Sequence, residues 1–259
     1  MLLEVKDLNI SLTSGKSVAE HISFRLGQGE MLSIVGSSGA GKTTICKAIM
    51  GLLGNAYRAD GEILFQEENL LDLPERKRQA IYGKEICLIM QNPMTAFNPS
   101  IRVGLQLEKT YLLHHGKTPR QEMQRLFAGI LQRLGLEDTQ RILNSYPFTL
   151  SGGMLQRLMI AAALMCQPSL LVADEATTAI DACNRIGLMR ELKSFCKDGM
   201  SVLFVTHDLR SASVSDRILV MDRGRIVEQG KTGQILNTPK EDYTKYLLNA
   251  CRLERREMS

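Results

Sequence analysis

The chain of 259 residues contains no tryptophan, and only 5% of its residues are aromatic. Its 32 basic and 28 acidic residues leave a net charge of +4, which is too slight to indicate binding to nucleic acid. The six cysteines are scattered, and none has the Cys-x-x-Cys spacing of zinc or iron–sulfur sites. We therefore expect reduced thiols in the core of a cytosolic protein.

Long apolar runs are also missing. The longest apolar stretch without a charged residue, residues 158–173, is interrupted by Gln167, Pro168 and Ser169, so it is too short for a membrane-spanning helix. Charged residues at positions 4, 6 and 7 leave no room for the apolar core of a signal peptide. We expect the chain to stay in the cytosol and to reach a membrane only through a partner.

Hydrophobic residues make up 44% of the chain and charged residues 23%, a balance typical of a folded protein with a sizeable core. Short apolar segments that alternate with helical segments predict an α/β fold, with a parallel sheet covered on both faces. The first thirty residues alternate like half-buried strands. Further strands are predicted at 31–35, 62–65, 86–90, 170–174, 201–206, 217–221 and 225–229, and helices at 45–53, 182–196, from 208, and in short segments at the end of the chain.

The middle of the chain has a different character. From about residue 92 to residue 165 the pattern indicates one helix after another, and we interpret this block as a helical insertion. The sequence therefore predicts a single domain, with a core of residues 1–91 and 166–259 and an insertion of residues 92–165.

A glycine-rich segment carries the strongest chemical signal. Gly36, Gly41, Lys42 and Thr43 match the phosphate-binding loop, and the segment follows a predicted strand and opens a predicted helix, as that loop requires. The glycines let successive backbone N–H groups converge on phosphates at the helix N-terminus. The Lys42 ammonium can then bridge two phosphates, and the Thr43 hydroxyl can bind Mg²⁺.

Two further segments support phosphate chemistry. Asp174 and Glu175 end an apolar strand, where one carboxylate can hold Mg²⁺ through its water shell and the next can accept a proton from an attacking water. Ser151, Gly152 and Gly153 precede an apolar helix, so they form either a second anion site or a plain helix N-cap.

These motifs occur in the order found in ATP-binding cassette ATPases, and the chain resembles that family over nearly its whole length. The shared motifs are the loop at residues 36–44, Gln91, the Ser-Gly-Gly signature at 151–153, the Asp174–Glu175 pair, Asp181 and His207. Residues 91–99, 146–157 and 239–248 resemble the ATPases of oligopeptide and nickel importers, with the nickel importer's ATP-binding subunit the most similar. The resemblance implies a phosphate-loop nucleotide-binding core, an N-terminal antiparallel β subdomain and an inserted helical subdomain that carries the signature.

The resemblance also implies a role for each motif. ATP is held by Gly36, Ser37, Ser38, Gly39, Ala40, Gly41, Lys42, Thr43 and Thr44. The implied Mg²⁺ residues are Thr43, Gln91 and Asp174. The implied catalytic residues are Glu175, which activates water, and Gln91 and His207, which act at the γ-phosphate. Ser151 and Gly153 act on the ATP held by a second subunit, and Asp181 lies where the subunits communicate.

The same resemblance implies partners and a location. The partners are a second ATPase subunit, identical or different, two transmembrane permease subunits and, indirectly, an extracytoplasmic solute-binding protein, with no nucleic acid among them. The chain would lie peripherally on the cytoplasmic face of the cell or inner membrane. There it would power the uptake of nickel, a metal–metallophore complex or peptides, in that order of preference.

The chain departs from the family pattern at three places. The segment of residues 8–13 has no aromatic side chain where the family often stacks adenine, and offers only Ile10 and Leu12. Ala176 stands where the family usually has proline, and the cysteine cluster of the oligopeptide type is missing around Cys251. We therefore expect the base to be held mainly by apolar contact.

Two other functions stay open. A soluble ATPase of the same fold that is not linked to transport is disfavoured, because the chain has one phosphate loop and no sustained heptads. A nucleotide-binding but inactive partner subunit is disfavoured because Lys42, Asp174, Glu175 and His207 are all present. The neighbouring His114 and His115 make a poor metal site, since adjacent residues do not share a helix face.

Overall fold

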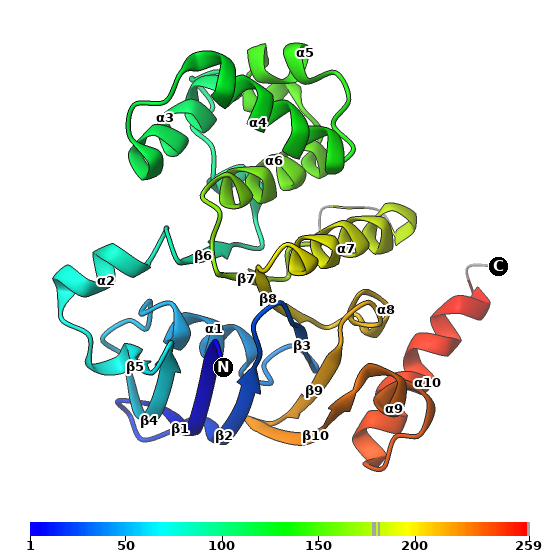
Figure 1. Ribbon diagram of the computed structural model, residues 1–259. Helices are drawn as coiled ribbons and strands as arrows, with labels where there is room; N and C mark the ends of the chain where they lie inside the picture. The colour runs from blue at the N-terminus through cyan, green and yellow to red at the C-terminus, as the bar shows by residue number, and fades with distance from the viewer. Residues whose placement is uncertain (178–179, 181, 258–259) are drawn as a thin grey trace.

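The computed structural model describes residues 1–177, 180 and 182–257, and Figure 1 shows two sheets on one side and a group of helices on the other. One sheet has four strands in the order β2-β1-β4-β5, and the other has six in the order β10-β9-β3-β8-β7-β6. The strands are β1 (Leu3–Leu12), β2 (Ser17–Leu26), β3 (Met31–Val35), β4 (Tyr57–Phe65), β5 (Glu68–Asn69), β6 (Ile86–Ile89), β7 (Leu170–Asp174), β8 (Ser201–Thr206), β9 (Arg217–Asp222) and β10 (Arg225–Lys231). The predicted α/β fold, with a parallel sheet and an N-terminal antiparallel sheet, is confirmed.

Helices cover both faces of the six-stranded sheet. They are α1 (Lys42–Ile49), α2 (Glu75–Ile81), α3 (Val103–His115), α4 (Arg120–Arg133), α5 (Thr139–Asn144), α6 (Gly152–Met165), α7 (Ala182–Lys197), α8 (Leu209–Ala212), α9 (Thr232–Asn237) and α10 (Asp242–Glu257), with short 3₁₀ turns at Leu70–Asp72, Pro93–Thr95 and Pro147–Thr149. Leu171 and Phe204 face α6 and α7, whereas Val172 and Leu203 face α1 and the four-stranded sheet. This alternation buries the central strands on both sides, which explains their continuous apolar sequences.

Strands β6, β7, β8, β3 and β9 run parallel, and β10 pairs with β9 in the antiparallel sense. Because the carboxyl ends of parallel strands meet at one edge of a sheet, the segments that follow β3, β6, β7 and β8 are brought together there. All four segments carry residues that the sequence motifs or the family resemblance link to phosphate chemistry.

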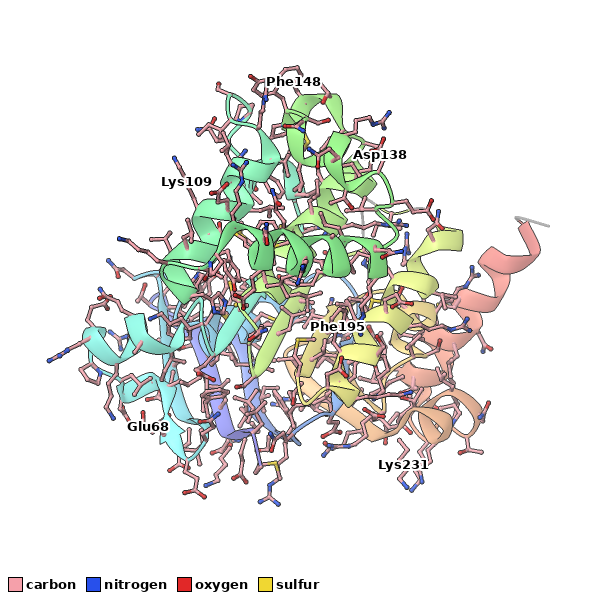
Figure 2. All side chains as sticks on the ribbon, turned by 45° about the horizontal axis from the view of Figure 1, so that its top comes forward. Glu68, Lys109, Asp138, Phe148, Phe195 and Lys231 are labelled. Carbon is pink, nitrogen blue, oxygen red and sulfur yellow. The ribbon has the colours of Figure 1, made fainter. Side chains whose placement is uncertain are left out.

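Helices α3 to α6, with the segments between them, form what we call the helical group, at the top of Figure 1. Its inner face joins the apolar cluster on the α7 side of the sheet. Arg133, the last residue of α4, fastens the group to α7: its guanidinium lies 3.6 Å from the ring centroid of Phe195 and donates to the Ser194 hydroxyl at 2.8 Å. Phe195 is labelled in Figure 2 at this junction. The helical group is therefore packed on the core.

Several elements differ from the sequence prediction, among them the first helix, β4, the last helix and α2, which was not predicted. The first helix begins at Lys42 and ends at Ile49, because Gly51 turns the chain with a φ of 65°. The strand expected at 62–65 begins earlier, at Tyr57. The last helix, α10, has 16 residues, so the prediction of only short helices at the end of the chain is wrong.

No described helix is both long and apolar enough to cross a membrane. The described cysteines follow the expectation of core thiols only in part, because Cys166 and Cys251 are half-buried. Cys46, Cys87 and Cys196 are buried free thiols.

Candidate active site

The phosphate-loop segment connects β3 to α1, and two of its glycines are required by the backbone around them. A Cβ atom at Gly36 would lie 2.3 Å from the carbonyl oxygen of Met221 on β9. Gly41 has a φ of 94°, and a Cβ there would lie 2.9 Å from the carbonyl oxygen of Val18. Neither position can hold a side chain without moving a neighbouring strand, so the tight curve of the loop depends on these two residues.

Lys42 places a buried ammonium inside the loop. Its Nζ donates to the carbonyl oxygens of Gly36 and Ser37, each at 2.8 Å, and the residue is only 5% exposed. Burial lowers the pKa of Lys42, and the carboxylates of Glu175 and Asp174 oppose that shift. The loop thus holds a cation beside two acidic side chains.

Thr43 and Asp174 meet where α1 begins and β7 ends. The Thr43 hydroxyl donates to Asp174 Oδ1 at 3.2 Å. Burial raises the pKa of the Asp174 carboxyl, while the Thr43 hydrogen bond lowers it and the neighbouring Glu175 raises it further. A hydroxyl and a carboxylate that converge in this way supply the hard oxygen donors that Mg²⁺ prefers, so these residues fit the expected ion.

Glu175 is held from two sides by side chains of distant segments. Gln91 Nε2 donates to Glu175 Oε2 at 3.0 Å, and His207 Nδ1 lies 3.0 Å from Glu175 Oε1. The backbone of Glu175 has a φ of 49°, in the left-handed region, and its N–H donates to Val205 O at 2.8 Å. A left-handed glutamate fixed by its neighbours is the kind of strain found at functional sites.

A hollow of about 360 Å³ opens beside these groups. It is lined by Val18, Ser38, Gly39, Gly41, Lys42, Thr43, Thr44, Gln91 and Glu175. The sequence did not indicate Val18, which reaches the hollow from β2. Of the two candidates for contact with a base, Ile10 is 1% exposed and packed in the core, whereas Leu12 is half-buried at the end of β1. Of these two residues Leu12 remains the candidate, and it lies outside the lining of the hollow.

The Ser-Gly-Gly segment lies elsewhere, at the start of α6. Ser151 Oγ accepts a hydrogen bond from Met154 N at 3.2 Å, so the N-cap interpretation is confirmed, and an anion site there stays a prediction. A second hollow, of about 570 Å³, is lined by residues 151–154, by Arg141 and Arg157, and by Ile180 and Asn184, among others. The two hollows share no lining residue. Asp181 lies outside the described residues.

Of the two neighbouring histidines of α3, His115 has a structural explanation. His115 Nε2 lies 2.8 Å from Met165 O, and its ring stacks on Tyr111 with centroids 4.3 Å apart. Within the described part of the chain, no cluster of three or more His, Cys, Asp or Glu side chains is arranged to hold a metal ion.

Comparison with known proteins identifies the class to which this site belongs. The family model described as ABC transporter matches residues 19–178 of the sequence. The chain therefore belongs to the ABC transporter family, and the prediction that it is an ATPase of that family is confirmed.

Among curated proteins, the metal-staphylopine import system ATP-binding protein of Staphylococcus aureus is 39% identical over 251 residues, covering 96% of this chain and 92% of the relative. The oligopeptide transport ATP-binding protein of Bacillus subtilis is 41% identical over 254 residues, covering 95% and 71%. Among solved structures, a dimeric ATP-binding cassette in a post-hydrolysis state with ADP and Pi matches with a TM-score of 0.79 and 26% identity, covering 89% of this chain and 99% of that one.

Proposed function

We propose that the chain is the ATP-hydrolysing subunit of a membrane importer, folded as a single domain whose residues 92–165 form the inserted helical part. The observation that carries this proposal is the convergence of the phosphate loop, Asp174, Glu175, Gln91 and His207 at one edge of the parallel sheet. The similarity to ATP-binding subunits of metal-staphylopine, dipeptide and oligopeptide importers supports the coupling of hydrolysis to import.

In the proposed reaction, backbone N–H groups of the loop and the Lys42 ammonium bind the phosphates of ATP. Mg²⁺, held by Thr43, Asp174 and Gln91, would supply charge neutralisation at the phosphates. The Glu175 carboxylate accepts a proton from the attacking water, because it lies beside the loop and is oriented through both of its oxygens. His207 and Gln91 hold that carboxylate and contact the γ-phosphate.

The signature segment completes the proposal. Ser151 and Gly153 line a hollow that none of the phosphate-loop residues reaches, which supports a role on the ATP of a second subunit rather than on that of the same chain. The dimeric solved relative with ADP and Pi supports a dimer.

The family resemblance and the relatives support a proposal for the partners and the cargo. We infer two permease subunits and a solute-binding protein, and a peripheral position on the cytoplasmic face of the membrane. Leu105 and Phe148 are 52% and 67% exposed on the helical group and offer apolar contacts to a permease. Phe148 is labelled at the edge of this group in Figure 2. Nickel, a metal–metallophore complex and peptides are the candidate cargoes.

Lys42→Ala tests the nucleotide site directly. It removes the buried cation, so Mg-ATP binding to the purified chain should weaken by at least about tenfold, as expected for loss of a charge-assisted contact. Lys109→Ala, on the exposed face of α3, is the matched control and should bind as the wild type does. Equal affinity in all three proteins would refute the assignment of the loop. ATPase assays with and without a second ATPase subunit then separate an active subunit from an inactive partner.

A further inference from the structure

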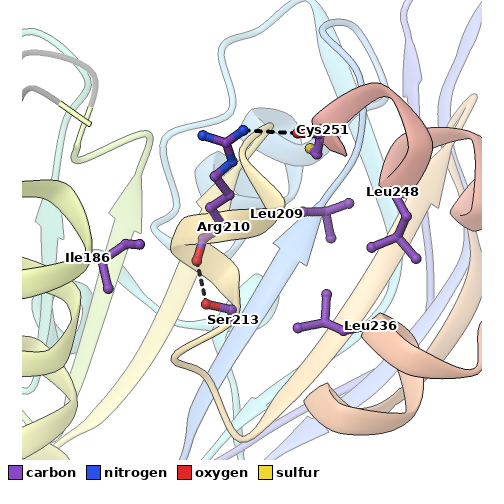
Figure 3. Close-up of a pocket in the computed structure, with 7 residues that line it drawn as sticks. All are labelled: Ile186, Leu209, Arg210, Ser213, Leu236, Leu248 and Cys251. Carbon is purple, nitrogen blue, oxygen red and sulfur yellow. Dashed lines mark hydrogen bonds between the residues drawn. The ribbon is translucent and has the colours of Figure 1, made fainter. Parts of the chain in front are cut away.

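The C-terminal helix α10 is fastened to the core near the active site. Figure 3 shows Leu209, Leu236 and Leu248, which line a hollow of about 460 Å³ between α8, α9 and α10. In the same view, Arg210 Nη2 donates to the carbonyl oxygen of Cys251 at 2.9 Å. Because α8 follows the segment that carries His207, this hydrogen bond links the C-terminal part of α10 to the side of the active site where His207 lies.

The start of α10 is fixed by a second set of contacts. The Glu228 carboxylate on β10 accepts from the backbone N–H groups of Lys240 and Glu241, at 2.8 and 3.2 Å. Thr244, in the first turn of the helix, is completely buried. These anchors leave the residue between them, Tyr243, little freedom to change position.

Tyr243 reaches the phosphate loop. Its hydroxyl oxygen accepts a hydrogen bond from the backbone N–H of Ser37 at 3.1 Å. Its ring packs in the apolar cluster that contains Val35, the last residue of β3, so the side chain lies against the strand that leads into the loop.

The hydrogen bond acts on one particular peptide group. The N–H of Ser37 and the carbonyl of Gly36 belong to the same planar unit, and that carbonyl accepts from Lys42 Nζ at 2.8 Å. The plane is therefore held on one edge by Tyr243 and on the other by Lys42. Rotation of this plane would break both bonds and would move the carbonyl that orients the Lys42 ammonium.

We propose that Tyr243 is a positioning residue for nucleotide binding: from the C-terminal helix, it fixes the Gly36–Ser37 peptide plane and, through it, the Lys42 side chain. This inference rests on the proposed function of the loop in binding ATP. Loss of one hydrogen bond of ordinary strength changes an equilibrium by about two- to tenfold, so that is the expected loss of Mg-ATP affinity without the hydroxyl.

Tyr243→Phe tests the proposal because it keeps the ring and removes only the hydroxyl. Tyr246→Phe is the matched control: its ring stacks on Tyr243 with centroids 6.5 Å apart, and the residue is 67% exposed. Mg-ATP dissociation constants of both variants and the wild type should differ only for Tyr243→Phe, by two- to tenfold. In an ATPase assay the same variant should raise KM with kcat nearly unchanged, because the loop binds ground state and transition state alike.

Amide hydrogen exchange at Ser37 distinguishes positioning from general support of the fold. Exchange should be slow at Ser37 in the wild type and faster in Tyr243→Phe, while the amides of α10 exchange as before. Exchange at wild-type Ser37 as fast as at the exposed Ser14 would overturn the proposal without any variant, and so would unchanged affinity in a folded Tyr243→Phe. If the wild type itself does not bind Mg-ATP, the proposed function fails instead.

Discussion

Two regions carry the proposed chemistry, and they are built differently. The strand-end cluster consists of the phosphate loop, Gln91, Asp174, Glu175 and His207, and the signature segment consists of residues 151–153. In the cluster, Thr43 is bonded to Asp174, and Glu175 to both Gln91 and His207. In the signature segment, the polar side chain that begins α6, Ser151, caps its own helix. The cluster is thus tied together across strands, whereas the side-chain hydrogen bond of Ser151 stays within the helix that it caps.

This difference indicates which half of the proposed catalytic site a single chain can form by itself. A network linked across four segments is organised by folding alone. A helix N-terminus that opens into a hollow of its own presents N–H groups to whatever approaches from outside. Changes in the cluster should therefore act on the isolated chain, and changes in the signature should act only when two subunits meet.

The largest expected effect lies in the cluster. Glu175→Gln keeps the size of the side chain and removes the base, so ATP turnover should fall by about 10²–10⁴ while ATP binding is retained. The measurement is steady-state ATPase activity beside a binding titration, with Glu122→Gln on the exposed face of α4 as the control. Turnover within threefold of the wild type would show that another group is the base.

The next effect concerns the signature. Ser151→Arg puts bulk and charge where the partner's phosphate would lie, so hydrolysis by the assembled pair should fall by about 10²–10³, while the isolated chain binds ATP as before. Ser151→Ala adds no bulk and removes the hydroxyl, so it measures the loss of the cap, about 1 kcal/mol, together with the loss of the hydroxyl's proposed contact with the partner's ATP. Full activity of Ser151→Arg in a mixture with a wild-type partner would show that the signature segment does not act on the partner's ATP.

A smaller effect is expected where the adenine ring of ATP would bind. Leu12→Tyr should tighten ATP binding by about two- to tenfold, the gain from stacking an aromatic ring on adenine. Leu52→Tyr, at an exposed leucine that does not line the hollow, should change nothing. The wild type should distinguish ATP from GTP by less than about tenfold. Strong preference for ATP without a gain in Leu12→Tyr would mean that other residues recognise adenine.

The smallest effect is on stability. Burial raises the pKa of Asp174, so the folded chain binds that proton more tightly than the unfolded chain, and the ionised carboxylate opposes folding above the raised pKa. Asp174→Asn should therefore raise the thermal midpoint at pH 7 by about 1–4 °C. The gain should shrink as the pH falls toward the ordinary value of 3.8.

Asp208 gives the control of opposite sign. Burial alone would raise its pKa, but hydrogen bonds from Ser211, Arg210 and Arg185 lower it, so its ionised form stabilises the fold at neutral pH. Asp208→Asn should lower the midpoint at pH 7. A drop in both variants would contradict the sign assigned to Asp174.

The central strands could be predicted closely from the sequence, and some surrounding elements could not. Strands β3, β7 and β8 were predicted with their observed bounds, because burial on both faces makes their sequences continuously apolar. Helix α2 was not predicted, since none of its residues is buried and it has no apolar periodicity. Helix α10 does have an apolar face, made by Tyr243, Leu247, Leu248 and Cys251, so its length lay within reach of the sequence pattern.

The candidate site likewise has features that the sequence predicts and features that it does not. The motifs marked the loop and the carboxylates, because phosphate chemistry restricts the residue types. The bonds from Glu175 to Gln91 and His207 join residues 84 and 32 positions apart, which no spacing rule predicts. Tyr243 lies in the family-like segment of residues 239–248, but its contact with Ser37 depends on how α10 packs and has no local signal in the sequence.

The left-handed backbone of Glu175 has a consequence for directed evolution of this protein. Glycine adopts a φ of 49° with the least strain, whereas a non-glycine residue at this φ lowers the stability of the folded state by about 1 kcal/mol or more. A library screened only for heat resistance should therefore enrich Glu175→Gly and discard the side chain that the proposed reaction needs. Variants from such a screen should be sequenced at this codon first, and activity should be kept in the selection from its first round.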